Sequence, residues 1–85
     1  MQRVEIYTTP FCPYCVAAKR LLAKKGVSFE ETDVSRDSGL RQKMTVRAGG
    51  RRTVPQIFIG GKHVGGSDEL HDLDHARKLD AMLAG

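Results

Sequence analysis

The sequence predicts an α/β protein in which a four-stranded mixed sheet carries helices on both faces. Two observations carry this prediction. Short segments rich in β-branched and aromatic residues alternate with longer segments of strong helix formers. The last two strand-like segments are separated by only two glycines, the spacing of a β-hairpin. A chain of 85 residues has room for one hydrophobic core, so we expect a single domain over residues 1–85.

The first part of the chain predicts a strand–helix–strand unit. Residues 3–8 are short and β-rich, which indicates a strand. The helix should begin at Pro13, whose missing N–H costs nothing at the first helical position, and should end before Gly26. Residues 27–34 indicate a second strand with imperfect alternation. A unit of this kind places its two strands parallel, with a right-handed connection.

The next part predicts a helix and a hairpin. Residues 38–48 have a narrow apolar stripe, and the polar residues just before them offer candidate caps. Pro55 opens a buried strand at residues 57–59, where a missing ladder donor matters least. Gly60 and Gly61 form the turn, and residues 62–64 form the antiparallel return.

The last helix should begin after Gly65-Gly66, with Ser67 as its N-cap and a possible break near residues 77–78. From the residues alone, this start is either a capped helix end or an anion site, because free N–H groups at a helix start bind carboxylates. The assembled order is β-α-β-α-β-β-α. That order is typical of a thioredoxin-like fold.

Composition limits the possible partners. The net charge is +4, which serves solubility or attracts an anionic substrate. Aromatic residues are few and are not interleaved with basic ones, so we expect no nucleic-acid partner. No apolar run approaches the roughly 20 residues of a membrane span. The chain opens on a strand-like segment without an apolar leader, so we expect neither a signal peptide nor a membrane partner.

The two cysteines, Cys12 and Cys15, lie where the first strand ends and the first helix begins. The first turn of a helix has unpaired N–H groups and the positive end of the dipole, which stabilise a thiolate. Cys12 is then the exposed nucleophile, and Cys15 lies one turn further in. The alternatives are structural thiols or half of a zinc site, but zinc normally takes four ligands. The strand–helix context favours redox chemistry, and such a pair suits a reducing cytoplasm.

Histidines offer a second metal hypothesis. His71 and His75 are four residues apart on a predicted helix, but no third ligand lies nearby in sequence. We therefore expect surface histidines and no bound metal.

Three motifs together carry a resemblance to a known family. Cys12-Pro13-Tyr14-Cys15, Thr53-Val54-Pro55 and Gly65-Gly66-Ser67-Asp68 stand in the order and approximate spacing of a dithiol glutaredoxin. From Val4 to its C-terminus the chain resembles the small bacterial glutaredoxin-3 type. The resemblance implies that Cys12 takes up glutathione or attacks a glutathionylated protein, and that Cys15 resolves protein disulfides.

The resemblance also implies a glutathione site. Its residues would be Tyr14, Thr53, Val54, Pro55, Gly66, Ser67, Asp68 and Arg52. Pro55 would be cis, and the main chain of Val54 would pair with the cysteinyl part of glutathione like an added strand. Backbone N–H groups near Ser67 would hold the γ-glutamyl carboxylate, and the Asp68 carboxylate would hold its ammonium.

The chain departs from many of these relatives at one position. They carry a lysine three residues before the first cysteine, where this chain has Thr9. The glycyl carboxylate of glutathione must then find another cation, and the candidates are Arg51 and Arg52.

These implications define one main hypothesis and two rivals. The main one is a cytoplasmic, monomeric, glutathione-dependent thiol–disulfide oxidoreductase, an electron carrier in cell redox homeostasis. Glutathione would be its co-substrate, and disulfide-containing or glutathionylated proteins its partners. The first rival is a carrier recharged by a flavoprotein reductase. The second is a carrier of an iron–sulfur cluster held by Cys12 and glutathione, which Pro13 disfavours, because cluster-binding relatives tend to have glycine there.

Overall fold

The computed structural model describes residues 1–85, and it arranges them as four strands and four helices. The elements are β1 (Val4–Thr8), α1 (Pro13–Lys24), β2 (Glu30–Asp33), α2 (Ser38–Arg47), β3 (Gln56–Ile59), β4 (Lys62–Gly65), α3 (Ser67–His75) and α4 (Leu79–Ala84). The predicted order is confirmed, with the last helix divided in two. None of the helices has the length and apolar character that a bilayer span requires.

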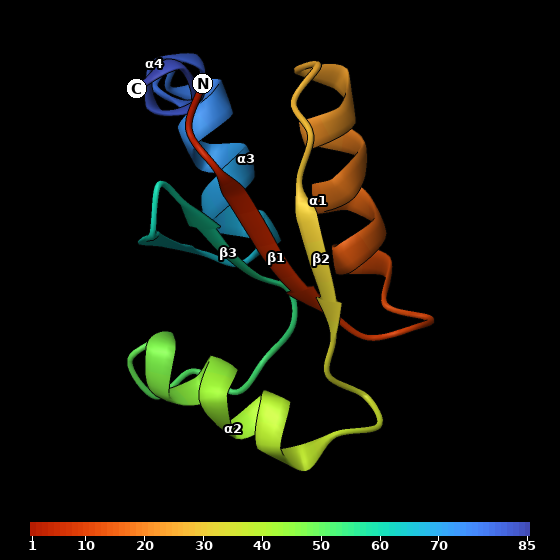
Figure 1. The fold of residues 1–85 in the computed structure, drawn as a ribbon. Helices are drawn as coiled ribbons and strands as arrows, with labels where there is room; N and C mark the ends of the chain where they lie inside the picture. The colour runs from red at the N-terminus through yellow and green to blue at the C-terminus, as the bar shows by residue number, and fades with distance from the viewer.

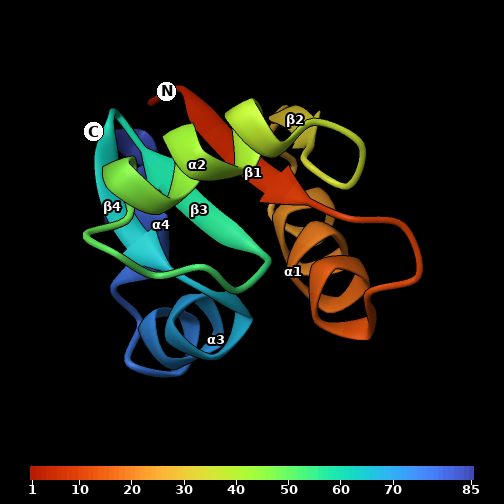
Figure 2. The ribbon, with the colours of Figure 1, turned by 90° about the horizontal axis from the view of Figure 1, so that it is seen from below.

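The four strands form one mixed sheet in the order β2-β1-β3-β4. β1 and β2 are parallel, with Ile6 opposite Glu31, whereas β3 runs antiparallel to both β1 and β4. α1 and α3 lie on one face of the sheet and α2 lies across the other, as Figures 1 and 2 show. This is the predicted thioredoxin-like architecture, with helices on both faces.

Strand alternation divides the core into two unequal parts. In β1, Val4 and Ile6 point toward α1 and α3, while Tyr7 joins the α2 side. The larger cluster consists of Val4, Ile6, Ala18, Leu21, Leu22, Val27, Ile57, Ile59, Leu70, Leu79 and Leu83. The smaller cluster consists of Tyr7, Val34, Met44, Ala48 and Phe58. Both clusters lie against the same strands, so the sheet fixes α1 and α2 relative to each other.

The second strand is shorter than predicted. It begins at Glu30, so Val27 and Phe29 lie outside it. Val27 is buried because it packs into the larger core from the turn after α1, where its N–H donates to the carbonyl of Leu22. The apolar character of residues 27–29 therefore comes from core packing and not from strand pairing.

The predicted break in the last helix is confirmed. α3 ends at His75, and Arg77 takes a left-handed conformation with φ 61°. Lys25 of the loop after α1 connects the two pieces, because its Nζ lies 2.6 Å from Asp74 and 3.0 Å from Asp80.

Candidate active site

Cys12 lies at the start of α1, where the backbone changes from loop to helix. It is the N-cap residue, with extended φ −105° and ψ 108°, and Pro13 follows at the first helical position as predicted. The half-buried Cys12 Sγ accepts a hydrogen bond of 3.2 Å from the backbone N–H of Cys15. The Cys12 sulfur therefore accepts one of the free N–H donors of the first turn and lies at the positive end of the helix dipole.

Cys15 has a different environment although it is only three residues away. It is 1 % exposed, whereas Cys12 remains partly accessible. Burial, reinforced by the hydrogen bond with Cys12, raises the pKa of the Cys15 thiol to about 12. The first turn of α1 therefore presents one accessible sulfur and one protonated, enclosed sulfur.

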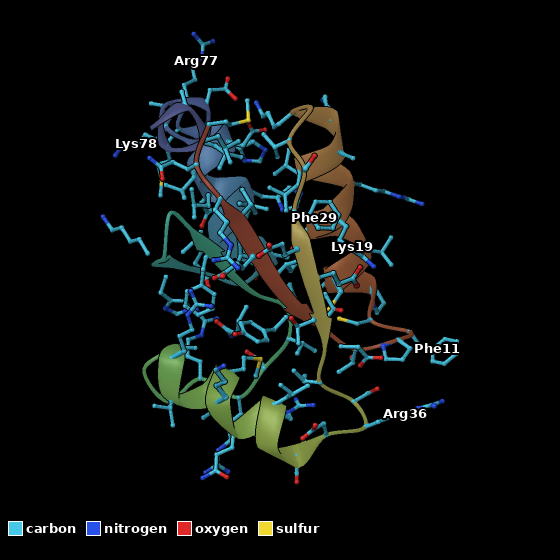
Figure 3. The ribbon with its side chains drawn as sticks, viewed as in Figure 1. Phe11, Lys19, Phe29, Arg36, Arg77 and Lys78 are labelled. Atoms are coloured by element: carbon cyan, nitrogen blue, oxygen red, sulfur yellow. The ribbon has the colours of Figure 1, made fainter.

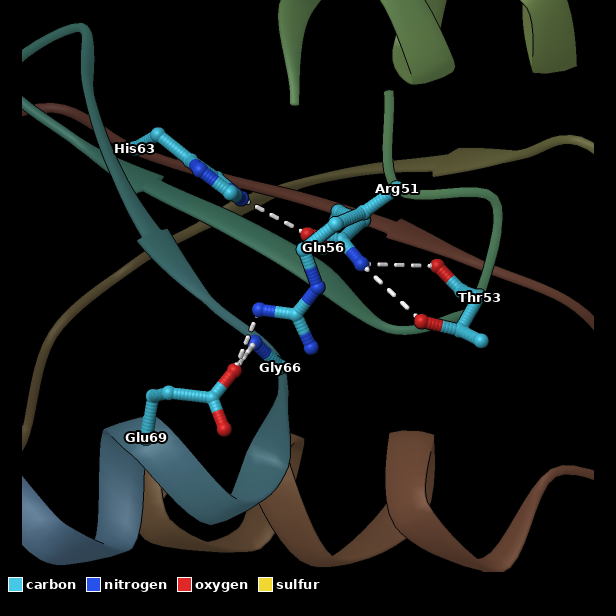
Figure 4. A network of polar contacts seen from close by, with 6 residues as sticks. All are labelled: Arg51, Thr53, Gln56, His63, Gly66 and Glu69. Atoms are coloured by element: carbon cyan, nitrogen blue, oxygen red, sulfur yellow. Dashed lines mark hydrogen bonds and ion pairs between the residues drawn. The ribbon is translucent and has the colours of Figure 1, made fainter. Parts of the chain in front are cut away.

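The segment before β3 brings a second stretch of backbone against Cys12. The Val54–Pro55 peptide bond is cis, and the carbonyl oxygen of Val54 lies 3.9 Å from Cys12 Sγ. The fully buried Gln56 holds this segment from behind: its Nε2 donates to the carbonyl of Thr53 at 3.0 Å and to the Thr53 hydroxyl at 3.2 Å. The ring Nε2 of His63 lies 2.7 Å from Gln56 Oε1, which joins β4 to the same network (Figure 4).

At the start of α3, the carboxylate of Glu69 binds a backbone N–H and also pairs with Arg51. Glu69 Oε1 accepts a hydrogen bond of 2.9 Å from the N–H of Gly66 and lies 2.5 Å from Arg51 Nη1 (Figure 4). The Gly66 N–H, followed by Arg51, holds the pKa of Glu69 below its usual value. A Cβ at Gly66 would lie 3.3 Å from the carbonyl oxygen of Pro55, so the two loops approach each other closely here.

The prediction that Ser67 is the N-cap of this helix is wrong. Gly66 occupies that position, and Ser67 is the first residue of α3. The Glu69 side chain, three residues after the cap, already binds the Gly66 N–H. The Ser67 hydroxyl lies instead 3.3 Å from Nδ1 of His71, whose ring also contacts the Ser67 carbonyl at 2.7 Å.

These loops and helix ends surround a polar groove of about 430 Å³. Its lining residues come from the α1 start, the cis-proline segment, the α3 start and α2: Tyr14, Arg41, Arg51, Thr53, Val54, Pro55, Gly66, Ser67, Asp68 and Glu69. Seven of the eight residues assigned to glutathione by resemblance line this groove. It offers main-chain amides, two guanidinium groups and the exposed carboxylate of Asp68, which together suit a small peptide with charges of both signs.

Arg52, which the resemblance assigns to the glutathione site, does not line the groove. It lines a neighbouring hollow over α2, while the adjacent Arg51 lines the groove. Arg41 of α2 lines both hollows, and its Nη2 donates to the Arg52 carbonyl at 2.8 Å. No sequence signal places Arg41 here, because its position depends on how α2 packs across the sheet.

A second, smaller hollow of about 230 Å³ opens on the other side of the thiols. Cys12 and Cys15 both line it, together with Lys19 of α1 and Glu31 of β2. Lys19 Nζ lies 2.9 Å from Glu31 Oε2, and the same oxygen accepts a hydrogen bond of 2.7 Å from Thr8. No motif in the sequence marks this pair, because Lys19 and Glu31 come together only when α1 packs beside β2.

Comparisons with known proteins agree with this geometry. The sequence profile of the family described as Glutaredoxin matches residues 4–64. The chain is 52% identical over 84 residues to a glutaredoxin of Pseudomonas aeruginosa, covering 99% of each chain. It is 51% identical over 83 residues to glutaredoxin 3 of Escherichia coli K12, covering 98% of this chain and 99% of the relative.

Two solved structures show the same similarity. The solution structure of a glutaredoxin from Brucella melitensis has a TM-score of 0.86 and 54% identity, over 98% of this chain and 89% of that one. The crystal structure of a buckwheat glutaredoxin–glutathione complex has a TM-score of 0.89 and 28% identity, over 98% of this chain and 77% of that one.

Proposed function

Because the chain belongs to the glutaredoxin family of glutathione-dependent disulfide oxidoreductases, we propose that it reduces both protein disulfides and glutathione mixed disulfides through Cys12 and Cys15. The observation that carries this proposal is the pairing of an accessible sulfur at a helix start with an enclosed sulfur one turn deeper, beside a peptide-sized polar groove. In this role it carries electrons from glutathione to oxidised proteins.

Removal of glutathione from a protein needs only Cys12. Its thiolate attacks the glutathionyl sulfur, a Cys12–glutathione disulfide forms, and the protein leaves as a thiolate. A second glutathione thiolate then attacks the glutathionyl sulfur, which releases the Cys12 thiolate and oxidised glutathione. The Cys15 N–H is the hydrogen-bond donor that faces Cys12 Sγ at the start and at the end of this cycle.

Reduction of a protein disulfide uses both sulfurs. Cys12 attacks one sulfur of the substrate and forms a mixed disulfide, and the other substrate sulfur leaves as a thiolate. Cys15 then attacks Cys12 Sγ, which completes the Cys12–Cys15 disulfide and releases the second substrate sulfur. Two glutathione molecules restore the dithiol.

The groove supports glutathione as the co-substrate. The Val54 main chain beside Cys12 would pair with the cysteinyl residue of the tripeptide, with Thr53, Pro55 and Tyr14 around it. The N–H groups at the start of α3 would take the γ-glutamyl carboxylate, and Asp68 its ammonium.

The glycyl carboxylate needs a cation in the same groove. Arg51 and Arg41 line the groove, whereas Arg52 lies beyond it, so we assign this carboxylate to Arg51 with Arg41 beside it. Glu69 holds Arg51 in place. The buckwheat glutaredoxin, which is 28% identical to this chain and was solved as a complex with glutathione, supports glutathione as the ligand.

An assay on a small glutathione mixed disulfide tests the proposal. Turnover is coupled to glutathione reductase and NADPH, and the Cys15→Ser variant is the matched control. We expect turnover by the wild type and by Cys15→Ser, with loss of insulin-type protein disulfide reduction in Cys15→Ser. Recharging of the oxidised protein by thioredoxin reductase, but not by glutathione, would contradict the proposal and support the flavoprotein-dependent carrier.

A further inference from the structure

The hollow beside Cys15 contains charged side chains that have no role in the proposed reaction steps. Cys12, Cys15, Lys19, Glu31 and Asp33 line it, and Lys19 is the only cationic residue among its lining. The glutathione groove on the opposite side includes neither Cys15 nor Lys19. The resolving thiol, although it is 1 % exposed, therefore borders the hollow that contains Lys19 and not the groove in which glutathione is proposed to bind.

Helix geometry directs Lys19 toward this thiol. Lys19 is four residues after Cys15 on α1, so the two side chains share one face of the helix. Side chains on a helix lean toward its N-terminus, which carries the Lys19 stem back over the turn that holds Cys15. In Figure 3 Lys19 lies between α1 and β2, near the end of the helix that holds the two sulfurs.

The Lys19 ammonium is anchored. Its Nζ lies 2.9 Å from Glu31 Oε2, and that oxygen also accepts the hydroxyl of Thr8, which is 1 % exposed. Because Thr8 ends β1 and Glu31 belongs to the adjacent β2, the sheet itself fixes the position of the cation. A flexible surface lysine would lose more side-chain entropy when it takes up such a position.

Neighbouring groups shift the pKa values of Cys15, Glu31 and Asp33. The Lys19 charge opposes burial and lowers the pKa of the Cys15 thiol, although burial dominates. Hydrogen bonds from Lys19 and then from Thr8 hold the pKa of Glu31 below its usual value, so Glu31 is an ionised anchor and a weak base. Contacts with Ser35 lower the pKa of Asp33 in the same way.

We propose that the Lys19 ammonium, held by Glu31 and Thr8, stabilises the Cys15 thiolate as that thiolate forms in the resolving step. This inference rests on the proposed dithiol reduction. The Cys15 S–H proton passes to water in the hollow, and the thiolate attacks Cys12 Sγ in the mixed disulfide. The Cys12–Cys15 bond forms, the bond from Cys12 to the substrate sulfur breaks, and the substrate leaves as a thiolate that takes a proton from solvent.

Rapid mixing of the reduced protein with a small disulfide peptide tests this step. Attack by Cys12 gives a phase whose rate depends on peptide concentration, whereas resolution by Cys15 gives a phase whose rate does not. We expect Lys19→Met to slow the second phase relative to the first by about tenfold, the effect of one pKa unit on a thiolate population. We expect Lys19→Arg, which keeps the charge, to restore most of this loss.

Lys24→Met is the matched control, because Lys24 is an exposed lysine at the far end of the same helix. It should leave the ratio of the two phases unchanged. Equal slowing of both phases by Lys19→Met, equal effects of Lys24→Met and Lys19→Met, or an unchanged resolving phase would each overturn the inference. Failure of the proposed function is seen separately, as absence of the first phase in the wild type.

Discussion

Two hollows flank the start of α1, and they differ in the chemical groups that line them. The larger groove provides main-chain amides, two arginines and the Asp68 carboxylate, and it borders Cys12 through the carbonyl of Val54. The smaller hollow provides the Lys19–Glu31 pair and reaches both Cys12 and Cys15. The first has the chemistry of peptide recognition and the second has the chemistry of charge and proton control. Recognition and resolution are thus assigned to opposite sides of one helix start.

Replacement of the shared nucleophile should remove the function of both hollows. Cys12→Ser lacks the sulfur that forms every mixed disulfide, so removal of glutathione from a peptide and reduction of a protein disulfide should both fall to background. The glutathione-coupled assay and an insulin-reduction assay measure the two activities. Residual turnover in either assay would mean that Cys15 can act as nucleophile, and the assignment of the two thiols would be wrong.

A change in the groove alone should affect glutathione and leave resolution intact. Asp68→Asn removes the negative charge proposed to bind the γ-glutamyl ammonium. Hydrogen bonds to charged groups contribute roughly 1.5–3 kcal/mol, so the KM for glutathione should rise roughly 10- to 100-fold.

Asp72→Asn is the matched control for this change, because Asp72 is an exposed aspartate on the same helix that does not line the groove. A KM that stays the same in Asp68→Asn, or that rises equally in Asp72→Asn, would exclude the proposed role of Asp68.

The rate of the resolving step by Cys15 should depend strongly on pH. With the pKa of Cys15 raised to about 12, its thiolate fraction at neutral pH is small. That fraction increases about tenfold with each pH unit below the pKa, so the resolving phase should accelerate by about that factor per unit between about pH 6 and 9. Rapid-mixing rates measured across this range check the prediction. A resolving phase independent of pH would show that Cys15 ionises far more readily than its burial indicates.

The smallest expected effect comes from placing a cation three residues before Cys12, where the resemblance to glutaredoxins implies a lysine. Thr9→Lys places an ammonium beside the smaller hollow, which Thr9 lines. An exposed charge pair contributes roughly 0.2–1 kcal/mol, so glutathione-dependent turnover should rise by no more than about fivefold, and the rise should diminish in high salt. Turnover measured at low and high salt tests this, and a salt-independent increase would argue against an electrostatic origin.

Local patterns predict much of this fold. Pro13 and Gly26 mark the limits of α1, the Gly60-Gly61 pair marks the hairpin, and the break near Arg77 falls within the predicted residues 77–78. The limits of β2 are not predictable in this way, because Val27 is apolar and packs into the core without belonging to the strand. A strand and a core-packed turn give the same short apolar run.

The site shows the same distinction between local and distant information. Both thiols and the residues of three short motifs are recognisable in the sequence, since each motif is contiguous. Arg51 and Arg52 are adjacent in an irregular segment, and only the tertiary structure shows which of them faces the groove. Arg41 and the Lys19–Glu31 pair depend on packing between elements that are distant along the chain, so spacing alone does not reveal them.

The most direct test of the division between the thiols is the alkylation rate of each cysteine in the reduced protein, followed by peptide mass spectrometry with iodoacetamide at neutral pH. The structure predicts that the accessible, helix-capping Cys12 is modified at least about 100-fold faster than the enclosed Cys15, since the thiolate is the reactive species. Comparable rates at the two positions, or faster modification of Cys15, would contradict the account.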